Sequence, residues 1–356
     1  MAIAGEGWLR VYEDRSQLSL YEDYPQGFLC QPDPLFGWIG KPNISGLETF
    51  IEEDMADMKV EMNSEGFWDT EHPTRKQPGV KRLLFLGDSF TIGFGVAVKD
   101  RFTEVIKEYL LPNHEVINMG IWGYSTDQEL LVLKEKGLKY TPDIVILSLF
   151  LDDLFCNNLF SVNDGLYIKP KFTLSEDRNL ELTNFPVPNN HGRSLLLNMI
   201  LSRLSKLRNR KEVGLEFYKR DWPSIFDRDY AKKRKYMITL HLLMEIHALS
   251  TNNGANFLLV IIPFKEQLRA GEIYAAGGKF LDIPPDRLDL GFPQRLLTRF
   301  CRNTGIPVLD LLPVFQEHNQ AEGHFFKADI HWTGEGHKLA AQEIFKYLKG
   351  HGLVGG

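Results

Sequence analysis

Two short segments that lie far apart in the chain carry side chains suited to nucleophilic catalysis. One is Gly87-Asp88-Ser89, and the other contains Asp329 and His331. In an extended segment, residues two apart point the same way, so the carboxylate of Asp329 can reach the imidazole of His331. A carboxylate on Nδ1 fixes the tautomer and leaves Nε2 free to take a serine proton. We therefore interpret Ser89 as a nucleophile, His331 as its general base and Asp329 as the residue that orients the base.

Each of these segments also has a simpler interpretation. Gly87 permits a tight turn that would present the hydroxyl of Ser89 near the start of a helix. Ser89 could equally serve only as the N-cap of that helix. An isolated Asp-x-His sequence occurs often by chance, so the hypothesis depends on both segments meeting in one site.

Three further loops place polar groups directly after apolar runs. Gly123 could bring a bare N–H close to a reacting oxygen, although a plain turn is the simpler explanation. Asp152 and Asp153 suggest an electrostatic role or a cation site, although such pairs also cap helices. We expect Lys265 and Gln267, together with Asp153, to contact the substrate, with an ordinary solvated loop as the alternative.

The elements that would position these residues alternate between strands and helices. The expected strands are the apolar runs 81–87, 114–120, 142–150, 255–264 and 306–315, and the expected helices are 102–111, 127–138, 230–249, 296–301 with its flanks, and 338–348. Continuous apolar runs are typical of strands buried on both faces of a parallel sheet. The pattern predicts βαβ units in a doubly wound sheet, whose ligands bind at the carboxyl ends of the strands. Thr333 is suited to cap the last helix, Gly350 to end it, and His337 within it is interpreted as structural.

The spacing of the runs also predicts the domain organisation. Residues 1–80 contain scattered Pro, Gly and aromatic residues and are expected to form an extended N-terminal segment packed on the core. Residues 81–350 form the α/β domain. About 100 residues separate its third and fourth strands, too many for one crossover. We therefore expect residues 155–250 to form a mostly helical cap insertion.

Composition excludes several classes of function. The 356-residue chain has a formal net charge of -6, which argues against nucleic acid as a partner. The three cysteines form no CxxC pair, which argues against a zinc ribbon or a disulfide framework and favours the cytoplasm. No apolar run reaches the length of a membrane span. The alternative is a membrane-anchored extracytoplasmic domain whose anchor is missing, and the sequence leaves the oligomeric state open.

Four of these segments resemble the blocks of the SGNH, or GDSL-type, hydrolase family, in the same order and each after its strand. They are the turn at Ser89, the loop of Gly123, the pair Asp152-Asp153 and the segment of Asp329 and His331. The resemblance covers roughly residues 80–150 and 255–350. It implies a three-layer α/β/α flavodoxin-like sandwich around a central parallel sheet. It also implies Ser89 as the nucleophile, with an oxyanion hole formed by the backbone N–H groups of Ser89 and Gly123 and by the side chain at Asp152.

Two positions depart from the family pattern. Asp329 and His331 are separated by one residue where the family usually has Asp-x-x-His, and this form is similar to bacterial polysaccharide-acetylation proteins of the same superfamily. Asp152 stands where the family has an asparagine that donates to the oxyanion. An ionised carboxylate cannot donate, and losing one such donor costs about 10²- to 10³-fold in rate. Asp152 could be protonated, could point elsewhere, or could mark a changed reaction.

The resemblance implies a serine esterase that hydrolyses an O-acyl ester, such as an O-acetyl ester, of a carbohydrate or small metabolite through an acyl-enzyme intermediate. It requires no metal and no organic cofactor. The alternatives are an O-acyltransferase that uses the same site, a catalytically impaired binding protein, and metal-dependent phosphoester hydrolysis with Asp88, Asp152 and Asp153 as ligands. An apolar helix expected at 194–201 could approach a membrane, although packing within the cap is the simpler interpretation.

Overall fold

The computed structural model describes residues 29–48, 54–162, 167–187, 222–232, 235–275, 281, 283–318, 321–327 and 329–355. Five parallel strands form the central sheet in the spatial order β13-β12-β7-β5-β6. Their bounds are β5 Lys81–Gly87, β6 His114–Asn118, β7 Ile144–Phe150, β12 Asn256–Ile262 and β13 Val308–Asp310. All seven residues of β7 are buried, because helices cover both faces of the sheet. When these five strands are numbered 1 to 5 along the chain, their spatial order is 2-1-3-4-5, which is the flavodoxin-like arrangement.

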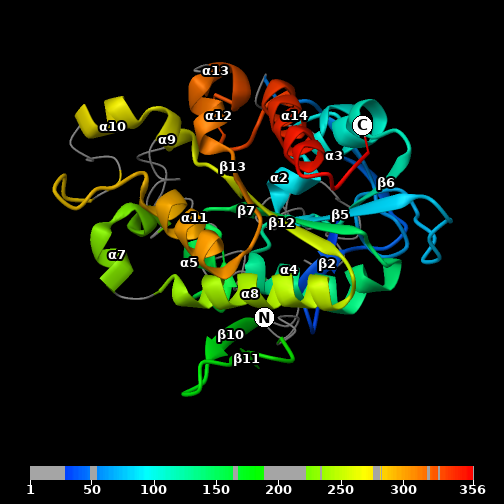
Figure 1. Ribbon diagram of the computed structural model, residues 1–356, viewed down its shortest axis with the longest axis horizontal. Coiled ribbons are helices and arrows are strands. Elements are labelled where there is room, and N and C mark those ends of the chain that lie inside the picture. The colour runs from blue at the N-terminus through cyan, green and yellow to red at the C-terminus, as the bar shows by residue number, and fades with distance from the viewer. Residues whose placement is uncertain are drawn as a thin grey trace, which may run out of the picture.

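Helices cover the two faces of this sheet (Figure 1). On one face, α4 (Thr126–Val132) packs against β5 and against α8 (Met237–Asn252), which also packs against β12. On the other face, α14 (Gly334–Gly350) packs against α3 (Phe102–Val105). The three-layer α/β/α sandwich expected from the sequence is therefore confirmed.

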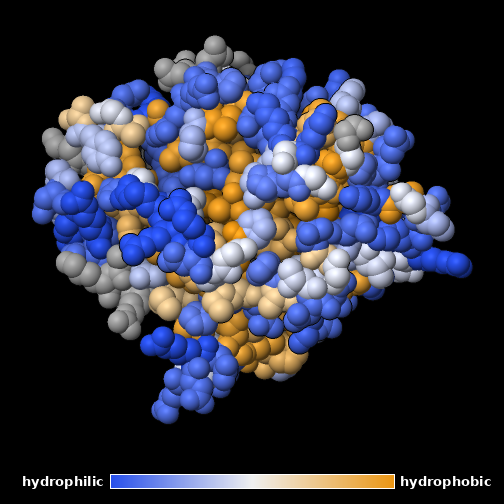
Figure 2. Space-filling view, viewed as in Figure 1, coloured by the Kyte–Doolittle hydropathy of each residue, from blue (hydrophilic) through white to orange (hydrophobic). Residues whose placement is uncertain are grey.

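The remaining helices are short or lie at the edges of the sandwich. They are α2 Ser89–Ile92, α5 Asp153–Cys156, α7 Arg228–Lys232, α9 Lys265–Leu268, α10 Ala270–Ala275, α11 Phe292–Thr304, α12 Leu312–Glu317 and α13 Ala321–His324, with single helical turns at Val98–Asp100, Ile106–Leu110, Leu133–Gly137, Leu138–Tyr140 and Trp222–Phe226. Figure 2 shows hydrophobic residues gathered between α12 and α14, over the central strands, with hydrophilic residues on the surrounding helices. None of the helices within the described ranges is both long and apolar enough to cross a bilayer.

One expected strand is half strand and half helix. Within the run 306–315, β13 ends at Asp310, and α12 begins at Leu312 with Pro313 in its first turn. Proline has no N–H to donate to a ladder, but it suits the first turn of a helix. The carboxylate of Asp310 accepts a hydrogen bond from the Leu312 N–H at 3.0 Å. The apolar composition of the run therefore misled the strand prediction.

The described part of residues 1–80 consists mainly of two hairpins. The first pairs β1 (Cys30–Asp33) with β2 (Gly37–Gly40), and the second pairs β3 (Ser45–Glu48) with β4 (Met58–Glu61). Trp38, Val60 and Trp68 belong to the same buried core as the sheet. The described part of this region therefore packs on the core and contains hairpins.

The described part of the insertion contains strands as well as helices. Four strands form two small hairpins there: β8 Ser161–Val162 with β9 Tyr167–Ile168, and β10 Lys171–Leu174 with β11 Leu180–Thr183. The longest helix of the interval, α8, covers the central sheet and is not part of a cap. The apolar helix expected at 194–201 and the basic stretch that follows it lie outside the described residues.

Candidate active site

Ser89 lies where β5 ends and α2 begins, at the carboxyl edge of the sheet. Gly87 has a φ of 156°, and a Cβ at this position would lie 2.1 Å from the Oγ1 of Thr91, so only glycine fits the turn. The carboxylate of Asp88 accepts a hydrogen bond from the Phe90 N–H at 2.9 Å and caps α2. The capping role that Ser89 could have played therefore belongs to Asp88, and the hydroxyl of Ser89 is available for another contact.

Ser89, His331 and Asp329 form one chain of hydrogen bonds. The Oγ of Ser89 lies 2.6 Å from the Nε2 of His331, and the Nδ1 of His331 lies 2.5 Å from the Oδ1 of Asp329. The same carboxylate oxygen accepts a hydrogen bond from the backbone N–H of His331 at 2.8 Å. Burial favours the neutral form of Asp329. The hydrogen bonds from His331 and the charge of His331 outweigh this effect of burial and lower the pKa of Asp329. The arrangement suits an imidazole that donates through Nδ1 and accepts through Nε2.

The segment around His331 is a small hairpin that fixes the imidazole. Phe325 and Trp332 form an antiparallel bridge, and the Phe326 N–H donates to the His331 carbonyl at 3.0 Å. The rings of Phe90 and Phe94 lie 4.8 Å and 4.7 Å from the imidazole, centroid to centroid. Because the backbone and both ring neighbours are packed, the imidazole has little freedom to turn away from Ser89.

Two backbone N–H groups are available where the resemblance places the oxyanion hole. Gly123 is exposed and has a φ of 68°. The Ile121 N–H donates to the Gly87 carbonyl at 3.1 Å, which ties the loop of Gly123 to the turn before Ser89. Among the described residues, the N–H groups of Ser89 and Gly123 have no hydrogen-bond partner. These donors could therefore face a substrate oxygen.

Asp152 follows β7 and is partly exposed. Its Oδ2 accepts a hydrogen bond from the Sγ–H of Cys156 at 3.3 Å. This oxygen is therefore engaged with the last residue of the helix that Asp152 precedes, α5. Asp152 could be protonated, could point elsewhere or could mark a changed reaction. The contact with Cys156 favours the second of these explanations, in which the side chain does not donate to the oxyanion.

The structure does not place Asp153 and Gln267 where a substrate could touch them. Asp153 is buried and its Oδ2 accepts from the Thr126 hydroxyl at 2.8 Å. Gln267 is also buried, and its amide donates to the Leu290 carbonyl at 2.6 Å. Asp153 begins α5, and Gln267 lies in the first turn of α9. The expected substrate contacts at these two positions are corrected accordingly.

Lys265 serves a contact that the sequence did not indicate. Its Nζ donates to the carbonyls of Phe326 and Lys327 at 2.5 Å and 2.9 Å. The Lys327 N–H in turn donates to the carboxylate of Asp54 at 2.9 Å. Lys265 therefore holds the hairpin that carries Asp329, which is a different role from the expected substrate contact.

Three buried carboxyl groups, Asp88, Glu129 and Asp153, lie behind Ser89 and are called the buried acid cluster below. Burial raises the pKa of Asp88 to about 7 and raises the pKa values of Glu129 and Asp153 well above their usual range, with a further rise from the neighbouring carboxyls. Among the described residues, neither carboxyl oxygen of Glu129 has a hydrogen-bond partner. Sequence reasoning missed Glu129, and its one signal was an acid within the otherwise apolar stretch that follows Gln128.

A buried ion pair adjoins this cluster. The Nζ of Lys169 donates to the carboxylate of Asp127, and both side chains are fully buried. Within the described ranges, no group of three or more His, Cys, Asp and Glu residues is arranged to hold a metal ion. Asp88 and Asp153, which were considered as metal ligands, instead accept hydrogen bonds from Phe90 and Thr126.

His337 lies in α14 with no exposed surface, as a structural residue would. Its Nδ1 accepts a hydrogen bond from the Phe102 N–H at 3.3 Å, and its ring stacks on that of Phe102. Burial, with the charges of His331 and Arg101, lowers its pKa to about 3. His337 is therefore a neutral packing residue.

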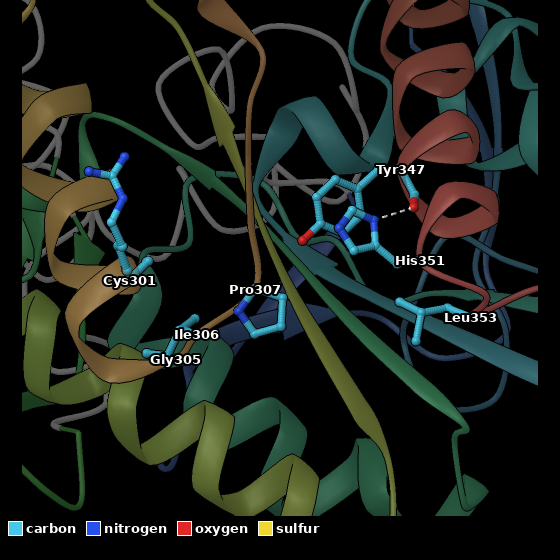
Figure 3. Close-up of a pocket in the computed structure, with 8 residues that line it drawn as sticks. Cys301, Gly305, Ile306, Pro307, Tyr347, His351 and Leu353 are labelled. Carbon is cyan, nitrogen blue, oxygen red and sulfur yellow. Dashed lines mark hydrogen bonds between the residues drawn. The ribbon is translucent and has the colours of Figure 1, made fainter.

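A surface pocket of about 360 Å³ lies away from these residues (Figure 3). It is lined by Cys301, Arg302, Gly305, Ile306, Pro307, Tyr347, His351 and Leu353. The pocket lies at the amino end of β13 and beside the last turn of α14, whereas His331 precedes the first turn of that helix. A helix of 17 residues spans about 25 Å. The geometry of the hydrogen-bond chain therefore identifies the candidate site better than this pocket does.

The C-terminal part of the chain is similar to a known family. Residues 227–354 match the family described as "SGNH hydrolase-like domain, acetyltransferase AlgX". No curated protein matches the chain.

Among solved structures, LAE5, an alpha/beta hydrolase enzyme from the metagenome of Lake Arreo, is 12% identical with a TM-score of 0.42, over 76% of this chain and 95% of that one. A putative lipolytic protein of the G-D-S-L family from Desulfitobacterium hafniense is 15% identical with a TM-score of 0.40, over 75% and 99%. The lipase/acylhydrolase from Enterococcus faecalis is 16% identical with a TM-score of 0.40, over 76% and 97%. The family match and the five-stranded parallel sheet together show that the chain has an SGNH/GDSL-type hydrolase fold.

Proposed function

We propose that this protein is a serine-dependent esterase that cleaves an O-acyl ester, in particular an O-acetyl ester, of a carbohydrate or small metabolite. The observation that carries the proposal is the hydrogen-bond chain from Ser89 through His331 to Asp329, with distances of 2.6 Å and 2.5 Å. A neutral imidazole at this distance can take the serine proton, and the carboxylate stabilises the imidazolium that results.

In the first half of the reaction, the Oγ of Ser89 attacks the carbonyl carbon of the ester. Its proton passes to the Nε2 of His331, and the carbonyl oxygen becomes an oxyanion that the N–H groups of Ser89 and Gly123 can stabilise. The C–O bond to the leaving alcohol then breaks, and the alcohol oxygen takes the proton from Nε2. An acyl ester on Ser89 remains.

In the second half, a water molecule attacks the acyl-enzyme. His331 takes a proton from this water, a second oxyanion forms in the same place, and the bond to the Oγ of Ser89 breaks. The proton on Nε2 returns to Ser89, and the carboxylic acid leaves. No proton carrier other than His331 is required.

A second candidate function is the transfer of the acyl group to a hydroxyl. The family that matches residues 227–354 carries the word acetyltransferase in its description, and this favours an acceptor other than water. The chemistry at Ser89 is unchanged, because an alcohol replaces the water molecule in the second half. Release of free acid measured with and without an added sugar acceptor separates the two functions.

The test is hydrolysis of p-nitrophenyl acetate and of longer-chain esters by the wild type and by Ser89→Ala. The matched control is Ser175→Ala, in the hairpin of β10 and β11 away from the site. We expect Ser89→Ala to lose at least about 10³-fold in turnover, whereas the control keeps wild-type turnover. Labelling with a fluorophosphonate should modify the wild type and not Ser89→Ala.

The outcomes separate the remaining functions. Turnover that survives in Ser89→Ala would contradict the proposal. Absence of both turnover and labelling in the wild type would favour a binding protein that keeps the fold without the reaction. Labelling without ester hydrolysis would favour the transferase.

A further inference from the structure

The hairpin of β1 and β2 reaches the loop that carries Gly123, although it comes from a part of the chain that the family resemblance does not cover. The indole N–H of Trp38, in β2, donates to the carbonyl oxygen of Trp122 at 2.9 Å. Trp38 is 3% exposed, so this bond is shielded from water. A Cβ atom on Gly123 would lie 3.7 Å from the ring of Trp38, so the two residues are close neighbours.

This hydrogen bond acts on the peptide unit that contains the Gly123 N–H. The carbonyl of Trp122 and the N–H of Gly123 belong to one planar amide group. This amide is trans, since the cis bond found in the described residues is at Phe185-Pro186. In a trans amide the C=O and N–H bonds point in opposite directions, so fixing the carbonyl also fixes the direction of the N–H.

Trp38 is itself held in place by Tyr124. The hydroxyl of Tyr124 donates to the Trp38 carbonyl, and the two rings pack edge to face at 5.5 Å. A second hydrogen bond of the hairpin, from the side-chain amide of Gln128 to the Phe36 carbonyl at 2.8 Å, lies outside this contact. A rigid donor can therefore act on the loop of Gly123.

Such a restraint matters because of the residue that it acts upon. Gly123 is exposed and lacks a side chain, so no Cβ limits rotation about its backbone bonds. The Tyr124 N–H donates to the Ile121 carbonyl at 3.3 Å and closes the turn, but this bond does not involve the Trp122–Gly123 peptide group. An oxyanion donor is effective only when it is oriented before the reaction. Without an external restraint, part of the population would hold the N–H away from the substrate oxygen.

We propose that Trp38 is a positioning residue that aims the Gly123 N–H at the developing oxyanion by holding the other side of the same peptide group. The inference rests on the proposed function of Ser89. Because the charge on the substrate oxygen develops only on the way to the transition state, the loss of Trp38 should lower kcat more than it raises KM.

The test compares Trp38→Phe with Gln128→Leu. Trp38→Phe removes the indole N–H and keeps an aromatic ring, whereas Gln128→Leu removes a buried hydrogen bond of the same hairpin without touching the Trp122–Gly123 peptide. We measure kcat and KM for p-nitrophenyl acetate and the second-order rate constant for labelling of Ser89 by a fluorophosphonate. For Trp38→Phe we expect kcat and the labelling rate constant to fall about 10- to 100-fold with KM changed less than about threefold, and Gln128→Leu to stay near wild type.

A benzothienylalanine at position 38 tests the same bond if Trp38→Phe fails to fold, because sulfur replaces the N–H in a ring of nearly equal shape. The same fall in kcat and labelling in this variant would support the inference. Equal rates in the wild type and the position-38 variants, or an equal loss in Gln128→Leu, would overturn it. A wild type that is neither labelled nor active would overturn the proposed function as well, which distinguishes the two failures.

Discussion

Two sets of carboxyl groups lie near Ser89 and differ in how their negative charge is stabilised. Asp329 accepts hydrogen bonds from both the imidazole and the backbone N–H of His331, and its pKa is lowered although it is largely buried. In the buried acid cluster, burial raises the pKa of all three carboxyls, and Glu129 has no hydrogen-bond donor among the described residues. Burial is the largest cause of the raised pKa values in the cluster, whereas at Asp329 the hydrogen bonds and the charge of His331 outweigh burial.

This difference has a consequence for catalysis. An anion beside His331 stabilises the imidazolium that forms when Ser89 loses its proton. The raised pKa values of the acids behind Ser89 reduce the negative charge that these acids place next to the oxyanion. Ionised acids there would oppose the oxyanion, so the contrast favours the proposed reaction.

The largest effect is expected for Asp329→Asn. The amide has no negative charge and favours the wrong imidazole tautomer, so kcat for p-nitrophenyl acetate should fall about 10⁴-fold. Steady-state kinetics measures this, with Asp310→Asn as the control, since Asp310 caps Leu312 away from His331. A loss of less than tenfold would mean that the charge of Asp329 is not what distinguishes it from the buried acids.

Asp152→Asn should raise kcat by about 10- to 100-fold, because it removes a negative charge at the carboxyl edge of the sheet and offers an amide N–H to the substrate oxygen in place of the contact with Cys156. The matched control is Asp152→Leu, which removes the charge and supplies no donor. A gain in both variants would assign the effect to charge, and a gain in the asparagine alone would assign it to the donor. If both variants lose activity, the carboxyl has a specific role of its own.

Glu129→Gln tests the opposite side of the comparison through stability. Because the pKa of Glu129 is raised in the folded state, the folded protein binds more protons than the unfolded chain, and the free energy of unfolding falls as pH rises. The glutamine should therefore be more stable than the wild type at pH 8, with a smaller gain near pH 4. Urea unfolding at the two pH values measures this, and the exposed Glu135→Gln should show neither change.

The smallest effect concerns His337, which is held neutral. Its pKa is lowered from 6.5 to about 3, so the unfolded chain binds the extra proton and stability is lost as pH falls below 6.5. Between pH 7.5 and pH 5.5, this residue should cost the wild type about 1.4 kcal/mol relative to His337→Phe. Urea unfolding of the wild type and of His337→Phe at both pH values measures this. An equal change in the free energy of unfolding for the two proteins would contradict the prediction.

Several elements were predictable because their signal is local. The apolar runs of β5, β6, β7 and β12 predicted buried parallel strands, and the structure contains them. Thr333 caps α14 as expected, with its hydroxyl accepting from the Gly336 N–H. The spacing of Asp329 and His331 also indicated the hydrogen bond between them.

Other features could not be predicted because they depend on contacts between distant segments. Whether Gln267 faces solvent or the interior depends on Leu290, which lies in another loop. Lys265 contacts the hairpin of Asp329 because α9 packs beside it, and no spacing rule reports this. The two small hairpins within the insertion were not predicted, because its apolar residues did not distinguish short hairpins from helices.

The sequence by itself determined the order of the strands along the chain, the turn at Gly87 and the pairing of Asp329 with His331, because these follow from neighbouring residues. Only the tertiary structure decided that Ser89 meets His331 at 2.6 Å, that Asp153 and Glu129 are buried, and that Trp38 reaches the Trp122 carbonyl. Each of these contacts joins segments that are adjacent only after the sheet has formed. The physical reason is that burial and long-range donors, which set charge and orientation, are properties of the packed chain and not of any short stretch of it.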